Sequence, residues 1–415
     1  MNILEDLKKT KNASYDLALL REDKRNAILT SLAEALLNSC GKILNANAKD
    51  LANIDKNNPL YDRLLLTENR IKAISDDLKN VVLLPSPIFK KLENKIMPNG
   101  LKIEKISVPL GVIGIIYEAR PNVTIDAFAL CFKSGNAVVL KGGKEAYHSN
   151  LTFVDIIQTC LKEHDVDVNS VYLFPPSREE THILLHATGL VDVCIPRGSQ
   201  SLINFVRQNA KIPVIETGAG IVHTYFDASG DLKKGRDIIN NAKTRRVSVC
   251  NALDCLLIHK ERIKDLYSLI EPLQNHNVEI FADAKSYEVL KANYNLELLH
   301  QAKAEDFGKE FLSYKLAIKV VDLIDEAIQH IINHTSSHSE AIITEDIKSA
   351  NCFIEKVDAA VVYVNASTAF TDGGQFGMGA EIGISTQKLH ARGPMGLESL
   401  TSYKWVVHGN GQVRN

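Results

Sequence analysis

The stretch that decides the fold reads Val112-Ile-Gly-Ile-Ile-Tyr-Glu-Ala-Arg-Pro-Asn-Val-Thr-Ile-Asp-Ala-Phe-Ala-Leu-Cys-Phe-Lys133. Residues 112–116 are an apolar run typical of a buried strand, and residues 125–133 are typical of a helix. The same alternation predicts strands at 137–140, 171–174, 191–195 and 213–216, with helices at 145–161, at 178–188 and from near Ser199. Repeated strand–helix–strand units predict a mostly parallel, doubly wound sheet.

A second series of strands and helices begins near Val222 and predicts a second α/β domain. Its expected strands are 256–258, 278–281, 316–320, 341–344 and 361–364, and 322–333 is an expected helix. The first 95 residues favour helices, because Ile28, Leu32 and Leu36 recur on one helical face. The turn signal Pro98-Asn-Gly100 predicts a hairpin at 97–108, and 402–407 is an expected final strand.

The composition is typical of a globular protein, with 45% hydrophobic and 24% charged residues among 415. The 48 basic and 50 acidic residues leave a net charge of −2, so no basic excess indicates nucleic acid or a membrane surface. No signal-like leader is visible, and no apolar run approaches the roughly 20 residues that cross a bilayer. The seven scattered cysteines predict a reduced, cytoplasmic protein without disulfides.

Four loops follow predicted strands of the first domain, where doubly wound sheets bind ligands. They are 117–122, 141–144, 197–199 and 217–220. Lys141 and Lys144 suit an anionic ligand, or they are a solvated strand end. Gly198 and Ser199 open a helix, where backbone N–H groups can hold a phosphate, or they form an ordinary strand–helix turn. The usual Gly-x-Gly-x-x-Gly motif is absent.

Three other polar residues have chemistry of their own. The Asn122 amide can donate to an oxyanion, although an Asn after Pro is also a common turn residue or helix cap. Glu216 is a candidate base or a salt-bridged structural group. His338, in a polar loop, contacts substrate or is an exposed histidine. No His-x-x-x-His pair has a carboxylate at metal-ligand spacing on a helix, so no metal site is expected.

The most reactive candidate is Cys250, which follows a helix-like run at 232–244 and the pair Arg245-Arg246. A positive field favours the thiolate, which is the nucleophilic form, although many cysteines are inert small hydrophobes. A phosphate site at a sheet edge, a single activated thiol and an amide donor fit one reaction class. That class is thiol-mediated hydride transfer between an aldehyde and an acyl derivative.

Longer segments carry a resemblance to a known family, in the family's order and over nearly the whole length. They are Val108–Thr124, Leu140–Glu145, Pro196–Ser199, Ile215–His223, Val249–Asp254, His338–Asp346 and Asn365–Arg414. On these segments the chain resembles the gamma-glutamyl phosphate reductases, also called glutamate-5-semialdehyde dehydrogenases, of the aldehyde dehydrogenase superfamily. The run Glu118-Ala-Arg-Pro-Asn122 is the most specific of them.

The resemblance implies a role for each matching residue. Cys250 would be the nucleophile, and Asn122 would hold the oxyanion together with the backbone N–H of Cys250. The NADP(H) site would be built from five residues, each matched to a part of the cofactor. They are Lys141 at the adenosine ribose, Lys144 at the 2′-phosphate, Gly198 and Ser199 near the pyrophosphate, and Glu310 at the nicotinamide ribose.

The implied reaction is the NADPH-dependent reduction of L-glutamyl 5-phosphate to L-glutamate 5-semialdehyde, with release of phosphate. Candidate contacts to the substrate are Arg120, Arg245, Arg246 and His338. Glu216 matches the general base of hydrolytic relatives, but here the acyl group leaves to phosphate, so its role is open. Implied partners are a second copy of the chain and glutamate 5-kinase.

The implied architecture has two doubly wound α/β domains and a small β element for oligomerisation. The cofactor domain would comprise 1–96 and 108–221, the catalytic domain 222–385, and the oligomerisation element 97–107 and 400–415. Two rival functions stay open. One is a CoA-acylating or hydrolytic aldehyde dehydrogenase, and the other is a non-catalytic scaffold that binds glutamate kinase and shields its acyl phosphate.

Overall fold

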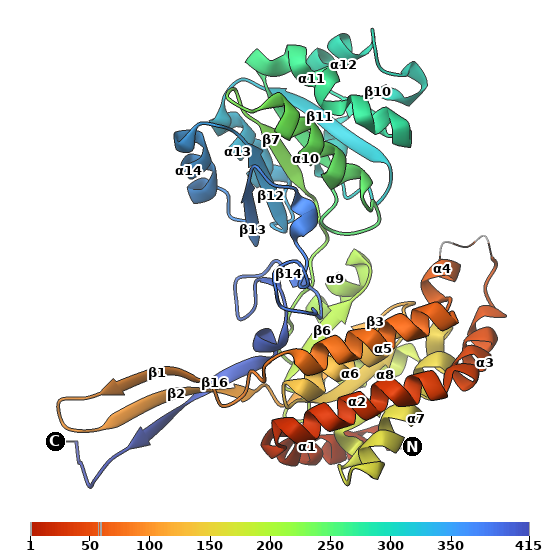
Figure 1. Ribbon diagram of the computed structural model, residues 1–415, viewed down its shortest axis with the longest axis vertical. Helices are drawn as coiled ribbons and strands as arrows, with labels where there is room; N and C mark the ends of the chain where they lie inside the picture. Colours follow the sequence, from red (N-terminus) through yellow and green to blue (C-terminus); the bar gives the residue numbers. More distant parts are fainter. Residues whose placement is uncertain (1, 57, 59, 415) are drawn as a thin grey trace. The chain divides into compact units, whose positions relative to one another are not determined.

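The computed structural model describes residues 2–56, 58 and 60–414, and the chain forms two compact units (Figure 1). The first unit extends as far as Thr217 and also includes Gly377–Gly383 and the chain from Met395 onward. The second unit comprises Gly218–Phe376 and Ile384–Pro394. The chain therefore returns to each unit after leaving it, whereas the sequence suggested one boundary at residue 221 and another at 385.

Helices form the start of the first unit, as the apolar periodicity predicted. They are α1 (Ile3–Leu19), α2 (Glu22–Asn38), α3 (Cys40–Leu51), α4 (Leu60–Leu64) and α5 (Glu68–Leu83). Ile28, Leu32 and Leu36 of α2 are fully buried, so the apolar face packs into the core. Helix α5 begins where the Thr67 hydroxyl accepts the N–H of Arg70 at 3.2 Å, which satisfies one free donor of the helix end.

A parallel sheet with the order β5-β4-β3-β6 is the core of the first unit. Its strands are β3 (Val112–Tyr117), β4 (Ala137–Gly142), β5 (Val171–Leu173) and β6 (Val193–Arg197). They alternate with α6 (Asn122–Lys133), α7 (Tyr147–Glu163) and α8 (Arg178–Leu185), and α9 (Gln200–Asn209) follows β6. Every residue of β3 and β4 is buried, as expected for parallel strands covered on both faces. The predicted alternation is confirmed.

The strand predicted at 213–216 does not form a ladder. Within the described residues it contributes one isolated parallel bridge, between Val214 and Cys194. The Cys194 N–H donates to the Pro213 carbonyl at 2.8 Å, and the Ile215 N–H donates to the Cys194 carbonyl at 2.9 Å. Pro213 has no N–H of its own, so the pairing cannot extend through it.

The predicted hairpin belongs to a three-stranded antiparallel sheet with the order β1-β2-β16. Its strands are β1 (Lys91–Ile96), β2 (Lys102–Pro109) and β16 (Thr401–His408), which form a ribbon within the first unit (Figure 1). The first strand lies before residue 97, not within 97–107, because Pro98–Gly100 is the turn itself. There the Met97 N–H donates to Leu101 at 2.8 Å, and Gly100 adopts φ 84°.

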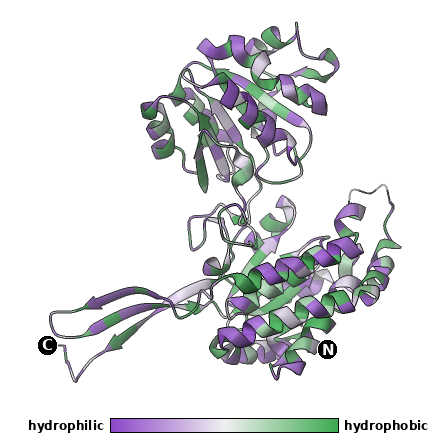
Figure 2. Cartoon of the chain, in the orientation of Figure 1, coloured by the Kyte–Doolittle hydropathy of each residue, from purple (hydrophilic) through white to green (hydrophobic). Residues whose placement is uncertain are grey.

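The second unit is built on a parallel sheet with the order β10-β9-β11-β8-β7-β12-β13. Its strands are β7 (His223–Phe226), β8 (Cys255–His259), β9 (Glu279–Ala282), β10 (Leu299–Gln301), β11 (Lys315–Val321), β12 (Ser339–Ile343) and β13 (Val361–Val364). Its helices are α10 (Leu232–Thr244), α11 (Leu266–Ile270), α12 (Ala284–Leu290), α13 (Ile324–His334) and α14 (Ile347–Lys356). Strand β8 at the centre of the sheet is largely hydrophobic, and the helices carry both hydrophilic and hydrophobic residues (Figure 2).

Two strands of this parallel sheet were not predicted. Strand β7 begins with His223 and Thr224, whose side chains interrupt the apolar run, and β10 has only three residues. Strands this short carry too few residues for a periodic signal. The predicted doubly wound second domain is otherwise confirmed. A short pair, β14 (Ile384–Ser385) with β15 (Gly393–Pro394), completes the unit near its C-terminal end.

Among the described residues, no single helix has the length and apolar character to cross a membrane. One bent pair, α2 with α3, satisfies that test by length and composition, with a 69° bend between the two helices.

Candidate active site

Cys250 lies in the second unit, on the segment that joins α10 to β8. Helix α10 ends at Thr244, and the exposed Arg245 and Arg246 follow it directly. The chain then turns, with the Ala252 N–H donating to the Val249 carbonyl at 3.2 Å. The cysteine is half-buried and lies five residues before β8. This placement suits a nucleophile better than an inert core thiol.

Buried polar groups hold the Cys250 segment on both sides. The amide of Asn251, which is 6% exposed, donates to the Thr371 carbonyl at 3.0 Å, and the Thr368 hydroxyl donates to the Asn251 carbonyl at 2.9 Å. The Leu253 N–H donates to the Ala242 carbonyl at 3.0 Å. A nucleophile must be held in one place to react efficiently, and these bonds supply that rigidity.

Position 220 needs a glycine because the Cys250 backbone lies against it. A Cβ on Gly220 would overlap the carbonyl group of Cys250, so no larger residue fits without moving that segment. The Gly220 N–H donates to a carboxylate oxygen of Glu310 at 2.8 Å. Burial raises the pKa of Glu310, and the Gly220 N–H opposes that shift. The sequence singled out the glycine-rich 217–220 as a loop but missed this contact.

Asn122 of the first unit is the first residue of α6, the helix that follows β3. Its amide donates to the Asp126 carboxylate, one helical turn later, at 2.9 Å. Burial raises the pKa of Asp126 to about 6, against the opposing effects of the Asn122 bond and of Arg197. Arg120, two residues earlier, is exposed. Asp126 was not among the predicted site residues, although its i+4 spacing from Asn122 on a predicted helix was a usable signal.

The two predicted lysines differ in environment. Lys141 lies on β4 and is 5% exposed, and burial lowers the pKa of its ammonium, while Glu180 and Glu145 oppose that shift. Lys144 opens a short 3₁₀ helix (Lys144–Ala146) and is exposed. A buried ammonium at the carboxyl end of a strand, beside an exposed one, suits a ligand with a polar part and an anionic part.

The N-terminus of α9 already binds an anionic group. The Ser199 N–H donates to one carboxylate oxygen of Glu118 at 2.8 Å, and its hydroxyl donates to the other at 3.0 Å. A Cβ on Gly198 would lie 2.6 Å from the same carboxylate, so glycine allows this close approach. Carboxylates and phosphates bind helix N-termini for the same electrostatic reason.

His338 and Glu216 are less available than the sequence suggested. His338, directly before β12, is fully buried, and its Nδ1 lies 2.8 Å from the Ser339 hydroxyl. Burial lowers the pKa of His338 to about 4. The interpretation of His338 as an exposed loop histidine is therefore wrong, because the polar loop folds inward at the start of β12. Glu216 is half-buried and pairs with Arg207 at 3.7 Å, which favours the structural alternative.

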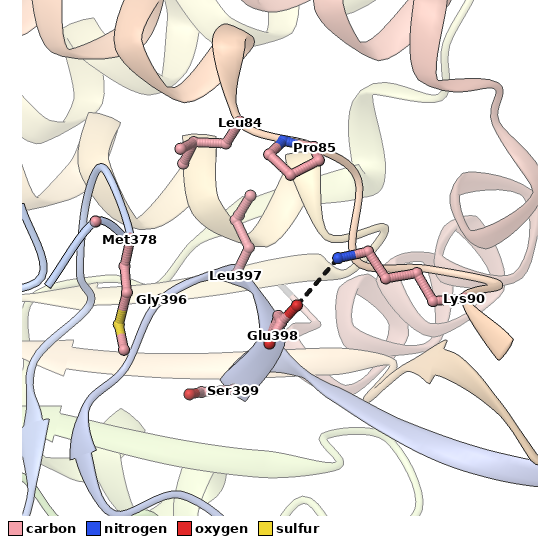
Figure 3. Close-up of a pocket in the computed structure, with 9 residues that line it drawn as sticks. Leu84, Pro85, Lys90, Met378, Gly396, Leu397, Glu398 and Ser399 are labelled. Carbon is pink, nitrogen blue, oxygen red and sulfur yellow. Dashed lines mark hydrogen bonds and ion pairs between the residues drawn. The ribbon is translucent and has the colours of Figure 1, made fainter. Parts of the chain in front are cut away.

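A pocket of about 310 Å³ in the first unit contains none of the predicted site residues (Figure 3). Its lining includes Leu84, Met378 and Leu397, and the Lys90 ammonium pairs with Glu398 at 3.0 Å at its rim. The candidate active site is therefore defined by the residues at the strand ends and not by this pocket.

Comparison with known proteins identifies the family. A gamma-glutamyl phosphate reductase of Legionella pneumophila (strain Paris) is 59% identical over 414 residues, which cover 100% of this chain and 99% of that protein. The chain belongs to the gamma-glutamyl phosphate reductase family. It is thus an oxidoreductase, as the resemblance of its motifs implied.

Comparison with solved structures supports the same family and shows the fold. The crystal structure of gamma-glutamyl phosphate reductase from Thermotoga maritima matches with a TM-score of 0.96 at 41% identity, over 100% of both chains. An acetylating aldehyde dehydrogenase from Geobacillus thermoglucosidasius matches with a TM-score of 0.70 at 16% identity, over 99% of this chain and 97% of its own. The predicted aldehyde dehydrogenase-like fold is confirmed. No family model matches the chain.

Proposed function

We propose that this chain reduces L-glutamyl 5-phosphate with NADPH to L-glutamate 5-semialdehyde and phosphate, the second step of proline biosynthesis from glutamate. The observation that carries the proposal is the full-length identity of 59% with a protein of the corresponding name. The half-buried Cys250, held on a rigid segment, supplies the nucleophile that such a reaction needs.

Cys250 acts first in the proposed cycle. Its thiolate attacks the acyl carbon of the substrate, a C–S bond forms, and the bond between that carbon and the phosphate oxygen breaks. Phosphate leaves with the electron pair, and the glutamyl group remains on Cys250 as a thioester. When bound, NADPH supplies the hydride that reduces this carbon. The resulting thiohemiacetal on Cys250 then breaks its C–S bond, which releases the semialdehyde and restores the thiolate.

Asn122 has the role of oxyanion donor in this proposal, with the backbone N–H of Cys250 as the second donor. Asp126 accepts one N–H of the Asn122 amide at 2.9 Å. A carboxylate can only accept, so this bond determines which end of the amide is nitrogen. The second N–H of the same nitrogen is then oriented by the bond to Asp126 and serves as the donor to the acyl oxygen.

The strand ends of the first unit fit the phosphates of NADPH. The N-terminus of α9 binds the Glu118 carboxylate through two Ser199 donors, and the same donors suit a pyrophosphate once Glu118 turns aside. Lys141 is assigned to the adenosine ribose, and the exposed Lys144 to the 2′-phosphate. Glu310 is assigned to the nicotinamide ribose through the carboxylate oxygen that does not accept from Gly220.

The substrate carries a carboxylate and a phosphate, so cations are expected around it. Arg120, Arg245 and Arg246 are exposed, and we assign these contacts to them. His338 takes part only if the segment before β12 moves, since its side chain is fully buried.

The remaining proposals concern assembly and location. Ile96, Trp405 and Val407 are 77%, 50% and 55% exposed on the β1-β2-β16 sheet, which suits contact with a second copy of the chain. Because the acyl phosphate substrate is labile, we also propose that glutamate 5-kinase is a partner that passes this substrate directly to the enzyme. We place the enzyme in the cytoplasm.

The reverse reaction on purified protein tests the proposed function. NADPH formation is followed from glutamate 5-semialdehyde and NADP, with and without phosphate, for the wild type, for Cys250→Ser and for the control Cys40→Ser. Turnover that requires phosphate and disappears only in Cys250→Ser supports the proposal.

Three other outcomes contradict it, each in favour of one rival. Turnover that does not depend on phosphate indicates a hydrolytic dehydrogenase, in which Glu216 would act as the general base. Turnover that requires coenzyme A in place of phosphate indicates a CoA-acylating enzyme. A folded wild-type protein without turnover indicates the kinase-binding scaffold.

A further inference from the structure

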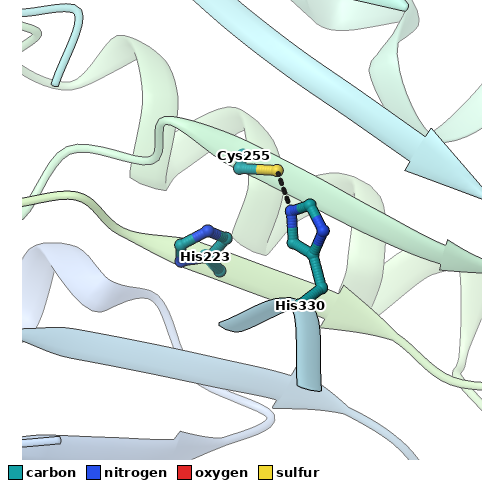
Figure 4. Close-up of side chains that lie close together, drawn as sticks. All are labelled: His223, Cys255 and His330. Atoms are coloured by element: carbon teal, nitrogen blue, oxygen red, sulfur yellow. Dashed lines mark hydrogen bonds between the residues drawn. The ribbon is translucent and has the colours of Figure 1, made fainter. Parts of the chain in front are cut away.

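Three potential metal ligands, none of them Cys250, meet in the second unit. They are His223 at the start of β7, Cys255 at the start of β8 and His330 on α13 (Figure 4). One ligand atom of each lies within 4.8 Å of the others. The side chains are buried, with 0%, 1% and 5% of their residues' surfaces exposed. We propose that this cluster binds one divalent transition metal ion of the zinc class.

The strand register creates the cluster. His223 and Cys255 are direct partners on the neighbouring parallel strands β7 and β8, so their side chains point to the same face. Glu340 of β12 is the direct partner of His223 on its other side. Helix α13 packs on this face and adds His330, whose Nε2 lies 3.9 Å from the Cys255 sulfur.

That separation suits a tetrahedral ion. Zinc–sulfur and zinc–nitrogen bonds of about 2.3 and 2.0–2.1 Å place the two ligand atoms about 3.6 Å apart. Two imidazoles and one thiolate are a preferred ligand set for zinc and for cobalt(II). Three protein ligands leave one position of a tetrahedral ion for a water molecule.

The two ring nitrogens of His223 have different surroundings. Its Nδ1 lies 3.1 Å from the Glu340 carboxylate, which also accepts the His223 backbone N–H at 2.9 Å. This arrangement leaves Nε2 as the nitrogen available to a metal. Within the part of the chain that the structure describes, Nε2 of His223 is buried without a hydrogen-bond partner. A carboxylate that orients a histidine in this way is typical of the surroundings of bound zinc.

The charges around the cluster nearly balance a divalent ion. The Glu340 carboxylate and a Cys255 thiolate together carry two negative charges, and the thiol loses its proton to solvent when the ion binds. The Lys319 ammonium, 3.4 Å from Nδ1 of His330, opposes binding. Lys319 is only half-buried, so its long side chain can turn toward solvent.

Cobalt(II) binding to the full-length protein tests the site, because cobalt bound to a thiolate has a charge-transfer band in the near ultraviolet. We expect one cobalt ion per chain with such a band, and displacement of cobalt by zinc. The band should persist in Cys250→Ser and Cys352→Ser and disappear in Cys255→Ala. His330→Gln should remove it as well, and Glu340→Gln should weaken binding by about 10–100-fold.

Two results would overturn the proposal. One is a wild-type protein that shows no charge-transfer band at saturating cobalt. The other is a band that disappears in Cys250→Ser and not in Cys255→Ala or His330→Gln. A band that persists in both Cys255→Ala and His330→Gln also contradicts the proposal, and because these two variants test the site independently, a folding defect in one of them leaves the other to decide. The catalytic assay of Cys250→Ser is read separately, so failure of the proposed reaction is distinguishable from failure of the metal site.

Discussion

In the two parallel sheets the candidate site residues lie at opposite ends of the strands. In the first unit Asn122 and Ser199 follow β3 and β6, and Lys141 lies at the carboxyl end of β4. In the second unit Cys250 and Glu310 precede β8 and β11, at the amino ends. The rule that ligands bind at carboxyl ends therefore locates the first-unit residues assigned to the cofactor, but it locates neither Glu310 nor the thiol. The thiol has to be recognised from its own chemical surroundings.

At the carboxyl ends of β7, β12 and β13 in the second sheet, polar side chains bind one another. Asp227, after β7, accepts from the Tyr225 hydroxyl at 3.0 Å and from the Thr344 hydroxyl at 2.7 Å. The Thr344 N–H donates to the Asn365 side chain at 2.9 Å. These polar groups therefore satisfy one another's hydrogen bonds across three strand ends.

The largest effect is expected at the amino edge of the second sheet. Cys250→Ser should lower kcat by about three orders of magnitude or more, because an alcohol is a far weaker nucleophile than a thiolate at neutral pH. Steady-state kinetics of the variant and of Cys40→Ser measures this. If Cys250→Ser keeps a tenth or more of the activity, the nucleophile lies elsewhere and the comparison of the two edges fails.

Gly220→Ala should lower kcat by about a hundredfold through displacement of the Cys250 carbonyl, since a misplacement of about 1 Å has effects of that size. The matched control is Gly41→Ala in α3, where an added Cβ meets nothing within 4 Å. The control should keep full activity. Equal activity in both variants would mean that the Cys250 segment adapts freely and is not the rigid element described above.

At the carboxyl edge of the first sheet the expected effect is smaller and specific to one cofactor. Lys144→Ala should raise KM for NADPH by about tenfold, through loss of one charge-assisted contact to the 2′-phosphate, and leave KM for NADH unchanged. Lys162→Ala, another exposed lysine, is the control. An equal rise for both cofactors would assign Lys144 to a part of the cofactor that they share.

Asp126→Asn should alter the pH dependence of stability. The folded-state pKa of Asp126, about 6, lies above its ordinary value of 3.8. The protonated form of Asp126 therefore makes its full contribution to folding stability below pH 3.8, and this contribution is lost as the pH rises through about 6. Because Asp126 is partly exposed, we expect the variant to gain on the order of 1–2 kcal/mol over the wild type at pH 8 and nothing near pH 4. Urea unfolding at both pH values measures the gain, and a gain of the same size at pH 4 would contradict the assigned cause.

Much of the fold and of the site could be predicted because the signals are local. A short apolar run followed by an amphipathic run identifies a strand and a helix without knowledge of the rest of the chain, as at 112–133. The chemical identity of Cys250, Asn122 and Lys141 and the segments around them were enough for the family. The helices and the parallel strands followed from short local stretches, and the aldehyde dehydrogenase-like fold followed from the resemblance of longer segments to the family.

The sequence by itself determined the strand and helix alternation and the family, and it supplied candidate residues for the chemistry. The tertiary structure alone decided that His338 is buried, that Pro213–Glu216 forms a single bridge, that Gly220 supports Cys250, and that His223, Cys255 and His330 meet. The physical reason is that burial and strand register depend on contacts between residues far apart in the chain. Propensity and spacing describe a residue's neighbours in the sequence, whereas packing determines its neighbours in space.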